Sequence, residues 1–429
     1  MISGPSRLPP WGPRLWANAV SFVNARVVIP GIGAPAAASI RFSSRVLSIG
    51  ERPKPHDTVV DLRGAIVLPG LINAHDHLEL NHYGRLKGRD RYENASGWID
   101  DMRPRLSADP TIRNGRAHPL VERLFIGGLK NLLAGVTTVA HHNPFYPEMR
   151  RTMAVRVVRR YGWAHSFLLE RQPAGAHGEP GGDVARRCQA TPSDAPFVVH
   201  LAEGVDEAAR GELSRLEALG CLKPNTVIVH GVAIDGDGWR RVARAGAGLV
   251  WCPASNDFLF GRSVPVRDLI DDGDRAGGNV CCARVNIALG TDSRVTGSRD
   301  LLDELRAARD AAPVSAAELL RMVTTGAAAL LRQPRPGRIA VGGPADLVVI
   351  PPFSAEPADA LLRTARRDVR LVMVGGRPIV GDPDLAAVFR ARRVKLRPLR
   401  VDEAPKLADS ALVRRLVGCP IVEPGVTPV

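Results

Sequence analysis

The sequence predicts an α/β protein in which a parallel strand–helix barrel is combined with a small sheet formed by both ends of the chain. From about residue 69 to about residue 335, short apolar β-rich runs alternate with helical segments. Other β-rich pieces, separated by Gly and Pro turns, stand on either side of this region. Repeated strand–helix units favour a parallel barrel, and a doubly wound sheet is the alternative that the pattern leaves open.

The chain divides into five predicted parts. Residues 1–18 are rich in Pro, Gly and Arg and predict an N-terminal arm. Residues 19–68 are expected to form the first, antiparallel part of the sheet domain, and residues 336–385 the second part. The barrel occupies residues 69–335. Apolar residues at helical spacing between Asp402 and Gly418 predict a helical tail over residues 386–429.

Particular runs carry these predictions. The strands expected in the barrel region are residues 136–140, 164–169, 197–200, 226–230, 248–251 and 286–290. The helices expected between or after them include residues 120–133, 207–219 and 301–311. The strands expected in the sheet domain are residues 25–29, 39–42, 45–49, 58–62, 346–350 and 369–374.

The composition argues against several classes of protein. Hydrophobic residues make up 45% of the 429 residues, and no apolar run approaches the roughly 20 residues of a membrane-spanning helix. The net charge is +14, but only six of the 58 basic residues are lysine and the arginines are scattered, which indicates composition bias rather than a nucleic-acid surface. The six cysteines form no C-x-x-C pair. We therefore expect reduced thiols and a cytoplasmic location, with neither nucleic acid nor membrane as a partner.

Two histidines end an apolar run near the start of the barrel region. Residues 65–72 are almost entirely apolar, and His75 and His77 follow at a spacing of two. On a β-strand this spacing points both imidazoles to the same side of the sheet, as half of a metal site requires. Taken alone, the pair fits surface or core packing equally well.

Three further ligand-type residues occupy equivalent places later in the chain. His200, His230 and Asp292 each stand at or just beyond the end of an apolar β-rich run. In a parallel barrel, residues just after the strands line one mouth, so these side chains are expected to converge with the histidine pair. Imidazoles and a carboxylate suit Zn or Fe(II). Glu203 follows His200 by three residues and is the candidate proton shuttle, while Asp292 would take the first proton and also hold the metal.

At these residues the sequence resembles the amidohydrolase superfamily, in particular its cytosine deaminase and triazine hydrolase (chlorohydrolase-like) branch. The resemblance spans residues 20–385 and rests on motifs found in order: residues 68–77 (LPGLINAHDH), 200–203 (HLAE), 230–231 (HG), 252–256 (CPASN), 289–293 (LGTDS) and 343–348 (GPADLV). As a set, these motifs are highly specific.

The resemblance implies a (β/α)8 TIM barrel with a composite β-sandwich, and hydrolysis at a carbon that bears an amino group or another leaving group. It makes His230 the residue that orients the substrate or the attacking hydroxide, and Glu203 the residue that moves protons. The metal ligands that it implies are His75, His77, His200 and Asp292.

The sequence also predicts how many metal ions are bound. Many relatives with two metals use a carboxylated lysine on a middle strand, but none of the six lysines stands at the end of a predicted barrel strand. We therefore expect one divalent metal, Zn, with Fe as the alternative. His141 and His142 follow the second predicted strand in a pattern that we cannot assign, so substrate contact, a second metal site and simple packing all stay open. The segment 273–284 is longer than the usual connection, which predicts an altered rim.

The predicted activity is attack by metal-held hydroxide on an amidine-like or amide carbon of a small molecule. The first hypothesis is deamination of a nitrogen heterocycle or a related compound. Hydrolysis of an amide, imide or C–halogen bond at the same site is the alternative. A catalytically dead binding or scaffold barrel would require lost ligands, and none is missing. The candidate substrate contacts are His141, His142, Asn256, Arg85 and Trp98. The resemblance leaves a homodimer open.

Overall fold

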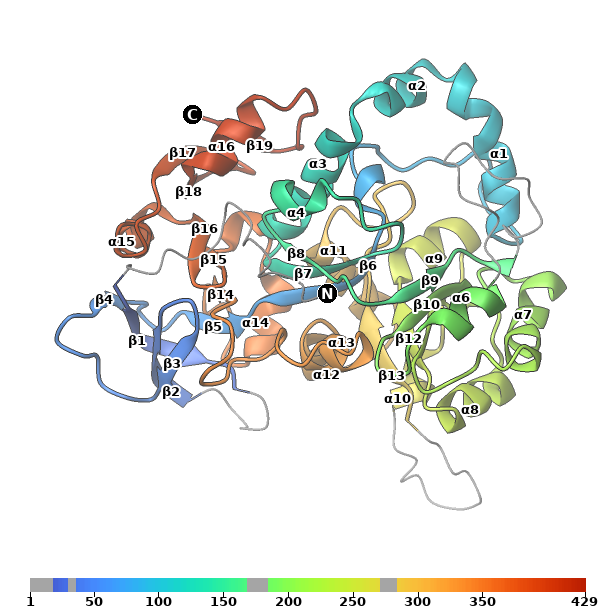
Figure 1. Cartoon of the computed structure of the whole chain (residues 1–429), viewed down its shortest axis with the longest axis horizontal. Helices are drawn as coiled ribbons and strands as arrows, with labels where there is room; N and C mark the ends of the chain where they lie inside the picture. Colours follow the sequence, from blue (N-terminus) through green and yellow to red (C-terminus); the bar gives the residue numbers. More distant parts are fainter. Residues whose placement is uncertain (1–17, 30–35, 168–183, 271–283) are drawn as a thin grey trace, which may run out of the picture.

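The computed structural model describes residues 18–29, 36–167, 184–270 and 284–429 (Figure 1). Apart from residues 18 and 284, the predicted arm at 1–18 and the segment at 273–284 lie outside these ranges. The described chain forms one eleven-stranded sheet and two smaller parallel sheets. In Figure 1 the large sheet lies toward the left, and the parallel sheets with their helices lie in the centre and on the right.

Both ends of the chain contribute strands to the eleven-stranded sheet. Its order is β19-β17-β18-β16-β15-β14-β5-β1-β2-β3, with β4 paired to β1. The two ends meet where β5 pairs antiparallel with β14 and Val67 lies opposite Val349. Phe22 and Phe42 pack edge to face in the core of this sheet, with ring centroids 4.8 Å apart. The strands are β1 (Val20–Val27), β2 (Ala36–Phe42), β3 (Val46–Ile49), β4 (Thr58–Asp61), β5 (Ile66–Pro69), β14 (Leu347–Ile350), β15 (Leu371–Val374), β16 (Arg377–Gly381), β17 (Leu396–Val401), β18 (Ala404–Asp409) and β19 (Val426–Pro428).

Strand directions in the N-terminal part correct the predicted antiparallel arrangement. β1 pairs antiparallel with β2 but parallel with β4 and β5. An alternation of apolar and polar residues identifies a strand but does not give its direction. The direction of β4 is set by the connection over residues 50–57, which leads into it. Asp57 anchors this connection, because its carboxylate accepts hydrogen bonds from Arg41 Nε and Ser21 Oγ, both at 2.8 Å.

The tail over residues 386–429 is only partly helical, which corrects the predicted helical tail. α15 (Ala386–Ala391) and α16 (Ser410–Val417) are helices, but β17, β18 and β19 extend the large sheet. Asp402 and Glu403 have positive φ angles of 46° and 68° and form the two-residue turn between β17 and β18. Asp is common at the first position of such a turn but Glu is uncommon at the second, so the sequence lacked the usual Asp-Gly signal and the helical spacing of the apolar residues was misleading.

Eight parallel strands lie in the sequence between the two halves of the large sheet. β6, β7 and β8 form one sheet, and β9 to β13 form the other. On one side the two sheets are linked by the amide of Asp292, which donates to the carbonyl oxygen of His75 at 3.1 Å. The strands are β6 (Leu71–Asp76), β7 (Val136–His141), β8 (Arg156–Val157), β9 (Gly162–Ala164), β10 (Phe197–Leu201), β11 (Thr226–His230), β12 (Gly248–Trp251) and β13 (Asn286–Leu289).

One hydrophobic cluster receives side chains from all eight strands or from the residue next to them. Successive side chains of a strand point to opposite faces, so this shared cluster marks a common inner face. Its members include Ile72, Ala140, Val158, Val198, Val229, Val250 and Ala288, with Trp163 packed against it. The sequence analysis missed β8, which has only two residues, and the strand that it placed at 164–169 ends at Ala164.

Helices connect and surround the parallel strands. The predicted helices at 120–133 and 301–311 appear with those bounds, and the one at 207–219 ends at residue 218. No helix within the described ranges is both long and apolar enough to cross a membrane. The helices not yet named are η1 (Leu78–Leu80), α1 (Ala95–Ala108), α2 (Pro110–Ala117), α3 (Leu120–Leu133), α4 (Met149–Thr152), α6 (Val184–Ala190), α7 (Glu207–Ala218), α8 (Gly236–Arg244), α9 (Pro253–Phe260), α10 (Val266–Ile270), α11 (Leu301–Ala311), α12 (Ala316–Met322), α13 (Thr325–Leu330), α14 (Pro357–Arg363), η2 (Arg366–Asp368) and η3 (Pro383–Leu385).

Gly376 offers a test of how the two ends of the chain pack together. Its φ is 72°, and a Cβ atom there would lie 1.7 Å from the carbonyl oxygen of Ser43. Gly376→Ala should lower the free energy of unfolding by more than the ~1–2 kcal/mol that a left-handed conformation costs, because the backbone must also move. Gly64→Ala is the matched control, since Gly64 has a φ of 79° and nothing within 4 Å of the added atom. Equal losses in urea unfolding would contradict the packing argument.

Candidate metal centre and active site

Each predicted metal ligand stands at the carboxyl end of a parallel strand. His75 lies near the end of β6, and His77 follows that strand directly. His200 lies one residue before the end of β10, and Asp292 lies three residues after β13. The carboxyl ends of parallel strands meet at one edge, so residues that are distant in the sequence come together there.

The candidate ligands His75, His77, His200 and Asp292 are called the ligand cluster below. Within 4.8 Å of one another lie the ligand atoms of His75, His77 and Asp292, and separately those of His75, His200 and His230. His75 Nε2 lies 3.3 Å from His200 Nε2 and 3.8 Å from Asp292 Oδ1, and His77 Nε2 lies 3.6 Å from the same oxygen. Ligand atoms about 2.0–2.2 Å from a tetrahedral zinc ion are separated by roughly 3.3–3.6 Å. These donors therefore fit a divalent metal ion.

The imidazoles are held in the neutral form that metal binding requires. Burial, reinforced by neighbouring imidazoles, holds the pKa of His75 and of His200 well below 6.5. His200 Nδ1 lies 2.9 Å from the carbonyl oxygen of His165 and donates its proton there, which leaves the lone pair on Nε2 for a metal ion.

Asp292 presents one carboxylate oxygen to the cluster. Its Oδ2 accepts hydrogen bonds from Ser255 Oγ at 2.9 Å and from Thr296 Oγ1 at 2.7 Å, whereas Oδ1 faces the histidines. Burial raises the pKa of this carboxyl, but the imidazoles of His77 and His230 and the Thr296 hydroxyl outweigh burial, so that the pKa is about 2. Asp292 is therefore ionised at neutral pH.

Glu203 and His230 face each other beside the ligand cluster. Glu203 Oε1 lies 3.5 Å from His230 Nε2, and the Glu203 side chain is 14% exposed. His230 Nδ1 lies 2.8 Å from Asn256 Oδ1 and donates its proton there, which leaves a lone pair on the buried Nε2. Burial raises the pKa of Glu203 to about 7. A carboxyl group with this pKa can accept and release a proton near neutral pH.

Three residues of the site adopt left-handed backbone conformations that non-glycine residues seldom use. The φ angle is 53° at Ala202, 72° at His230 and 52° at Asp292. Such conformations cost about 1–3 kcal/mol each and persist only where the surroundings impose them. The amide of Ala202, for example, donates to the buried Glu212 Oε2 at 2.6 Å. The fold therefore holds the strand ends in the positions that aim these side chains.

The two histidines at the end of β7, His141 within the strand and His142 directly after it, have different surroundings. His142 packs against the ligand cluster, with its ring centroid 4.2 Å from that of His200. His141 lies apart from it: its Nδ1 accepts a hydrogen bond from the amide of Leu78 at 3.3 Å, and its Nε2 lies 3.7 Å from Glu79 Oε2. Substrate contact by either histidine stays a prediction.

The other candidate substrate contacts already have partners within the protein. Asn256 is buried and supports His230. Arg85 Nε donates to the carbonyl oxygen of Gly297 at 3.0 Å, and the indole N–H of Trp98 donates to a backbone carbonyl at 2.9 Å. These contacts explain how the side chains are held, and their role toward a substrate also stays a prediction.

Sequence analysis assigned no role to His165 or Lys130. His165 forms a further three-histidine group with His142 and His200, in which the ligand nitrogens lie within 4.8 Å of one another. The spacing of two between Trp163 and His165 on the β9 run was the available signal, since it places both on one face. Lys130 is fully buried in α3, and the signal for it was a lysine inside an otherwise apolar helical stretch.

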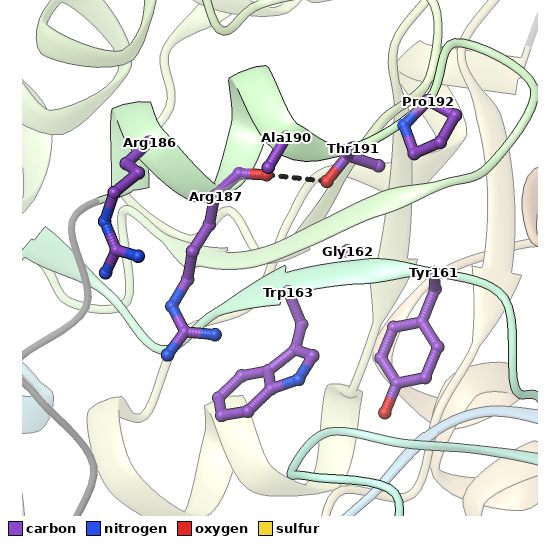
Figure 2. Close-up of a pocket in the computed structure, with 8 residues that line it drawn as sticks. All are labelled: Tyr161, Gly162, Trp163, Arg186, Arg187, Ala190, Thr191 and Pro192. Carbon is purple, nitrogen blue, oxygen red and sulfur yellow. Dashed lines mark hydrogen bonds between the residues drawn. The ribbon is translucent and has the colours of Figure 1, made fainter.

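A pocket of about 340 Å³ lies between β9 and α6 (Figure 2). Arg187 reaches from α6 toward Trp163, with its guanidinium carbon 4.8 Å from the centroid of the ring. None of the eight lining residues belongs to the ligand cluster, although the Trp163 ring lies 5.6 Å from that of His142. We assign this pocket no part in the chemistry.

Comparisons with known proteins identify relatives of the chain. Residues 183–379 match the amidohydrolase family. A 5-methylthioadenosine/S-adenosylhomocysteine deaminase from Haloarcula marismortui is 29% identical over 339 residues, which cover 68% of this chain and 74% of that protein.

Two solved structures share the fold. An adenosine deaminase from Xanthomonas campestris with bound zinc has a TM-score of 0.63 and 21% identity, and the match covers 88% of this chain and 97% of that one. A zinc complex of an atrazine chlorohydrolase from Arthrobacter aurescens has a TM-score of 0.64 and 21% identity, with coverage of 87% and 100%. Over residues 183–379 the chain is therefore similar to the amidohydrolase family, and the deaminase from Haloarcula marismortui extends this similarity to 68% of the chain.

Proposed function

We propose that this protein is a metal-dependent hydrolase that removes an amino group from a nitrogen heterocycle or a related small molecule. The observation that carries the proposal is a group of ligand atoms from His75, His77 and Asp292 within 4.8 Å of one another, with His200 beside His75 and with Glu203, a largely buried carboxyl whose pKa is raised to about 7, facing His230. The deaminase names among the relatives support the same reaction class. Aminated purines such as 5-methylthioadenosine are therefore the first substrates to try.

We also propose that the eight parallel strands close into a (β/α)8 barrel, with the large sheet as its composite sandwich. The shared inner cluster and the hydrogen bond from Asp292 to His75 support closure. The division of the chain into 19–68, 69–335 and 336–385 belongs to the same proposal. A cytoplasmic location, a homodimer and the lack of a nucleic-acid partner stay predictions.

The ligand cluster would hold one divalent ion, with zinc favoured by its donors and by the zinc-bound relative, and iron as the alternative. Such an ion supplies a Lewis acid that makes water a nucleophile near neutral pH. We assign the four ligand positions to His75, His77, His200 and Asp292.

The chain's own residues would move the protons. Glu203 takes a proton from the attacking water and passes it to the nitrogen that leaves. A C–O bond forms, the C–N bond breaks, and the carbon becomes a carbonyl. One water proton ends on the released ammonia and the other on the adjacent ring nitrogen. The lone pair of His230 Nε2, directed by Asn256, orients the water or an N–H group of the substrate.

Metal content and ammonia release test the proposed function directly. Purified protein should contain about one zinc or iron ion per chain, and His75→Ala/His77→Ala and Asp292→Ala should contain little metal and show no turnover. A panel of amino-substituted heterocycles should yield free ammonia, measured with a coupled assay. Metal-dependent turnover of amides or halides without ammonia would replace deamination by the alternative hydrolysis. Absence of metal from the wild-type protein would contradict the proposal.

The shuttle role of Glu203 predicts a particular pH dependence. Glu203 must be ionised to accept a proton, so kcat/KM should fall as the pH drops below about 7. A bound cation would lower the pKa of Glu203 and so shift this acidic limb of the pH profile to lower pH. Glu203→Gln should keep its metal, lose about 10²–10⁴-fold in kcat, and show no such limb. Glu304→Gln is the matched control, because Glu304 is also buried with a pKa of about 7 but lies outside the ligand cluster. A fully active Glu203→Gln enzyme would falsify the assignment.

Asn256 should act through His230. Asn256→Ala removes the acceptor of the Nδ1 proton, so we expect kcat to fall about 10–100-fold with unchanged metal content. Asn225→Ala is a suitable control, since Asn225 is also buried but donates to the carbonyl oxygen of Ala195 at 2.8 Å. Loss of metal in Asn256→Ala would show instead that this residue supports the metal centre itself.

A further inference from the structure

The ligand cluster has a second, fully buried polar cluster behind it, on the side of β6 that faces α3. We propose that Lys130 is a positioning residue that holds the two ligand-bearing segments, residues 75–77 and residue 292, in fixed relation through three hydrogen bonds from one ammonium group. This inference rests on the proposed function only in assuming that those segments bind a metal ion.

The three donors of the Lys130 ammonium group each have a different partner. Nζ lies 3.1 Å from Asp76 Oδ2, 2.8 Å from Asn81 Oδ1 and 3.0 Å from Thr291 Oγ1. An ammonium group has three donors, so all of them are used. Asp76 stands between the candidate ligands His75 and His77, and Thr291 directly precedes Asp292. One side chain of α3 therefore ties together both segments that carry ligands.

Asp76 receives donors from several parts of the chain. Its Oδ2 accepts from Lys130 and from Asn131 Nδ2 at 2.7 Å, and its Oδ1 accepts from Asn81 Nδ2 at 2.7 Å. Asp76 and Lys130 have no exposed surface. Two opposite charges out of contact with water are stable only while both are present, because loss of one leaves the other without compensation. The geometry of this pair is therefore strongly constrained.

The cluster lies where the backbone pairing of the parallel strands is interrupted. β6 belongs to one sheet and β13 to the other, and among the described residues a backbone hydrogen bond from the amide of Asp292 to the carbonyl oxygen of His75 links the ends of these strands. Side chains add to this link, since Asn73 Nδ2 donates to Thr291 Oγ1 at 2.8 Å and Asn73 Oδ1 accepts from the amide of Thr291 at 3.1 Å. Lys130, which extends from α3, donates a hydrogen bond to the same Thr291 hydroxyl.

The competing explanation is that Lys130 only stabilises the fold. Lys406 provides the comparison, because it is also a buried lysine that forms an ion pair, with Asp382, and donates to the carbonyl oxygen of Val369 at 2.8 Å. It lies in β18 of the large sheet, away from the ligand cluster. A general effect of removing a buried ammonium group should appear in both lysine variants, and a positioning effect only at Lys130.

Zinc release separates the two explanations. The full chain is loaded with zinc, and the first-order rate of zinc transfer to a chromogenic chelator is measured for wild type, Lys130→Met, Lys406→Met and Lys130→Met/Asp76→Asn. Near-ultraviolet circular dichroism of each zinc-free protein reports whether it is folded. We expect release from Lys130→Met to be at least tenfold faster than from wild type, and release from Lys406→Met to stay within twofold.

The double variant tests the charge pairing. Removing the Asp76 charge as well should bring the release rate closer to that of wild type than in Lys130→Met alone, because no uncompensated carboxylate remains. A wild-type release rate in folded Lys130→Met, or equal acceleration in Lys406→Met, would overturn the inference. If Lys130→Met does not fold, Thr291→Val takes its place, since it removes one acceptor without changing charge and should still accelerate release several-fold.

The same measurements distinguish this inference from the proposed function. If the wild-type chain binds neither zinc nor iron, the proposed function fails before any variant is compared. If it binds one zinc ion and releases ammonia from a substrate while Lys130→Met releases zinc at the wild-type rate, only the positioning role is wrong.

Discussion

The site depends on how two separate parallel sheets are held together where β6 meets β13. His75 and His77 come from one sheet, and His200 and Asp292 from the other. A metal ion bound to all four would therefore bridge the two sheets from the inner side. On the opposite side of β6, the buried ammonium group of Lys130 bridges the segments that carry His75, His77 and Asp292. The distances between the candidate ligands then depend on contacts made on both sides of β6.

Burial has opposite consequences for the two kinds of titratable group in the site. It lowers the pKa of His200, and so keeps the imidazole neutral and able to bind a metal. It raises the pKa of Glu203 to about 7, so that this carboxyl can exchange protons. Asp292 has imidazoles and hydroxyl donors around it and remains ionised despite its burial. The same water-poor surroundings thus keep the imidazole of His200 neutral, allow Glu203 to exchange protons and leave Asp292 ionised.

The fold is shared by an adenosine deaminase and by an atrazine chlorohydrolase. A divalent ion held by the candidate ligands would activate water, and this step is common to attack on an amino-substituted and on a halogen-substituted carbon. What differs is the leaving group and the surface that binds the rest of the substrate. Arg85 is held by the carbonyl oxygen of Gly297, which follows β13, and Trp98 of α1 is held by the carbonyl oxygen of Leu86.

Much of the fold was predictable because local pattern determines it. The helices at 120–133 and 301–311 follow from apolar periodicity, and five of the parallel strands, β7 and β10 to β13, follow from short apolar runs. The tail was mispredicted because the turn at Asp402 has Glu403 where glycine is usual. The direction of β4 was mispredicted because pairing direction depends on the connection rather than on the strand.

The sequence by itself determined which ligand-type residues end the parallel strands, since each of His75, His77, His200 and Asp292 follows or closes an apolar run that can be read locally. Only the tertiary structure decided what stands behind them. The partners of Lys130 come from two distant segments, residues 76–81 and Thr291, and Asn256 at the start of α9 meets His230 at the end of β11. Such contacts have no periodic signature along the chain, because they depend on distances that exist only after the strands have assembled.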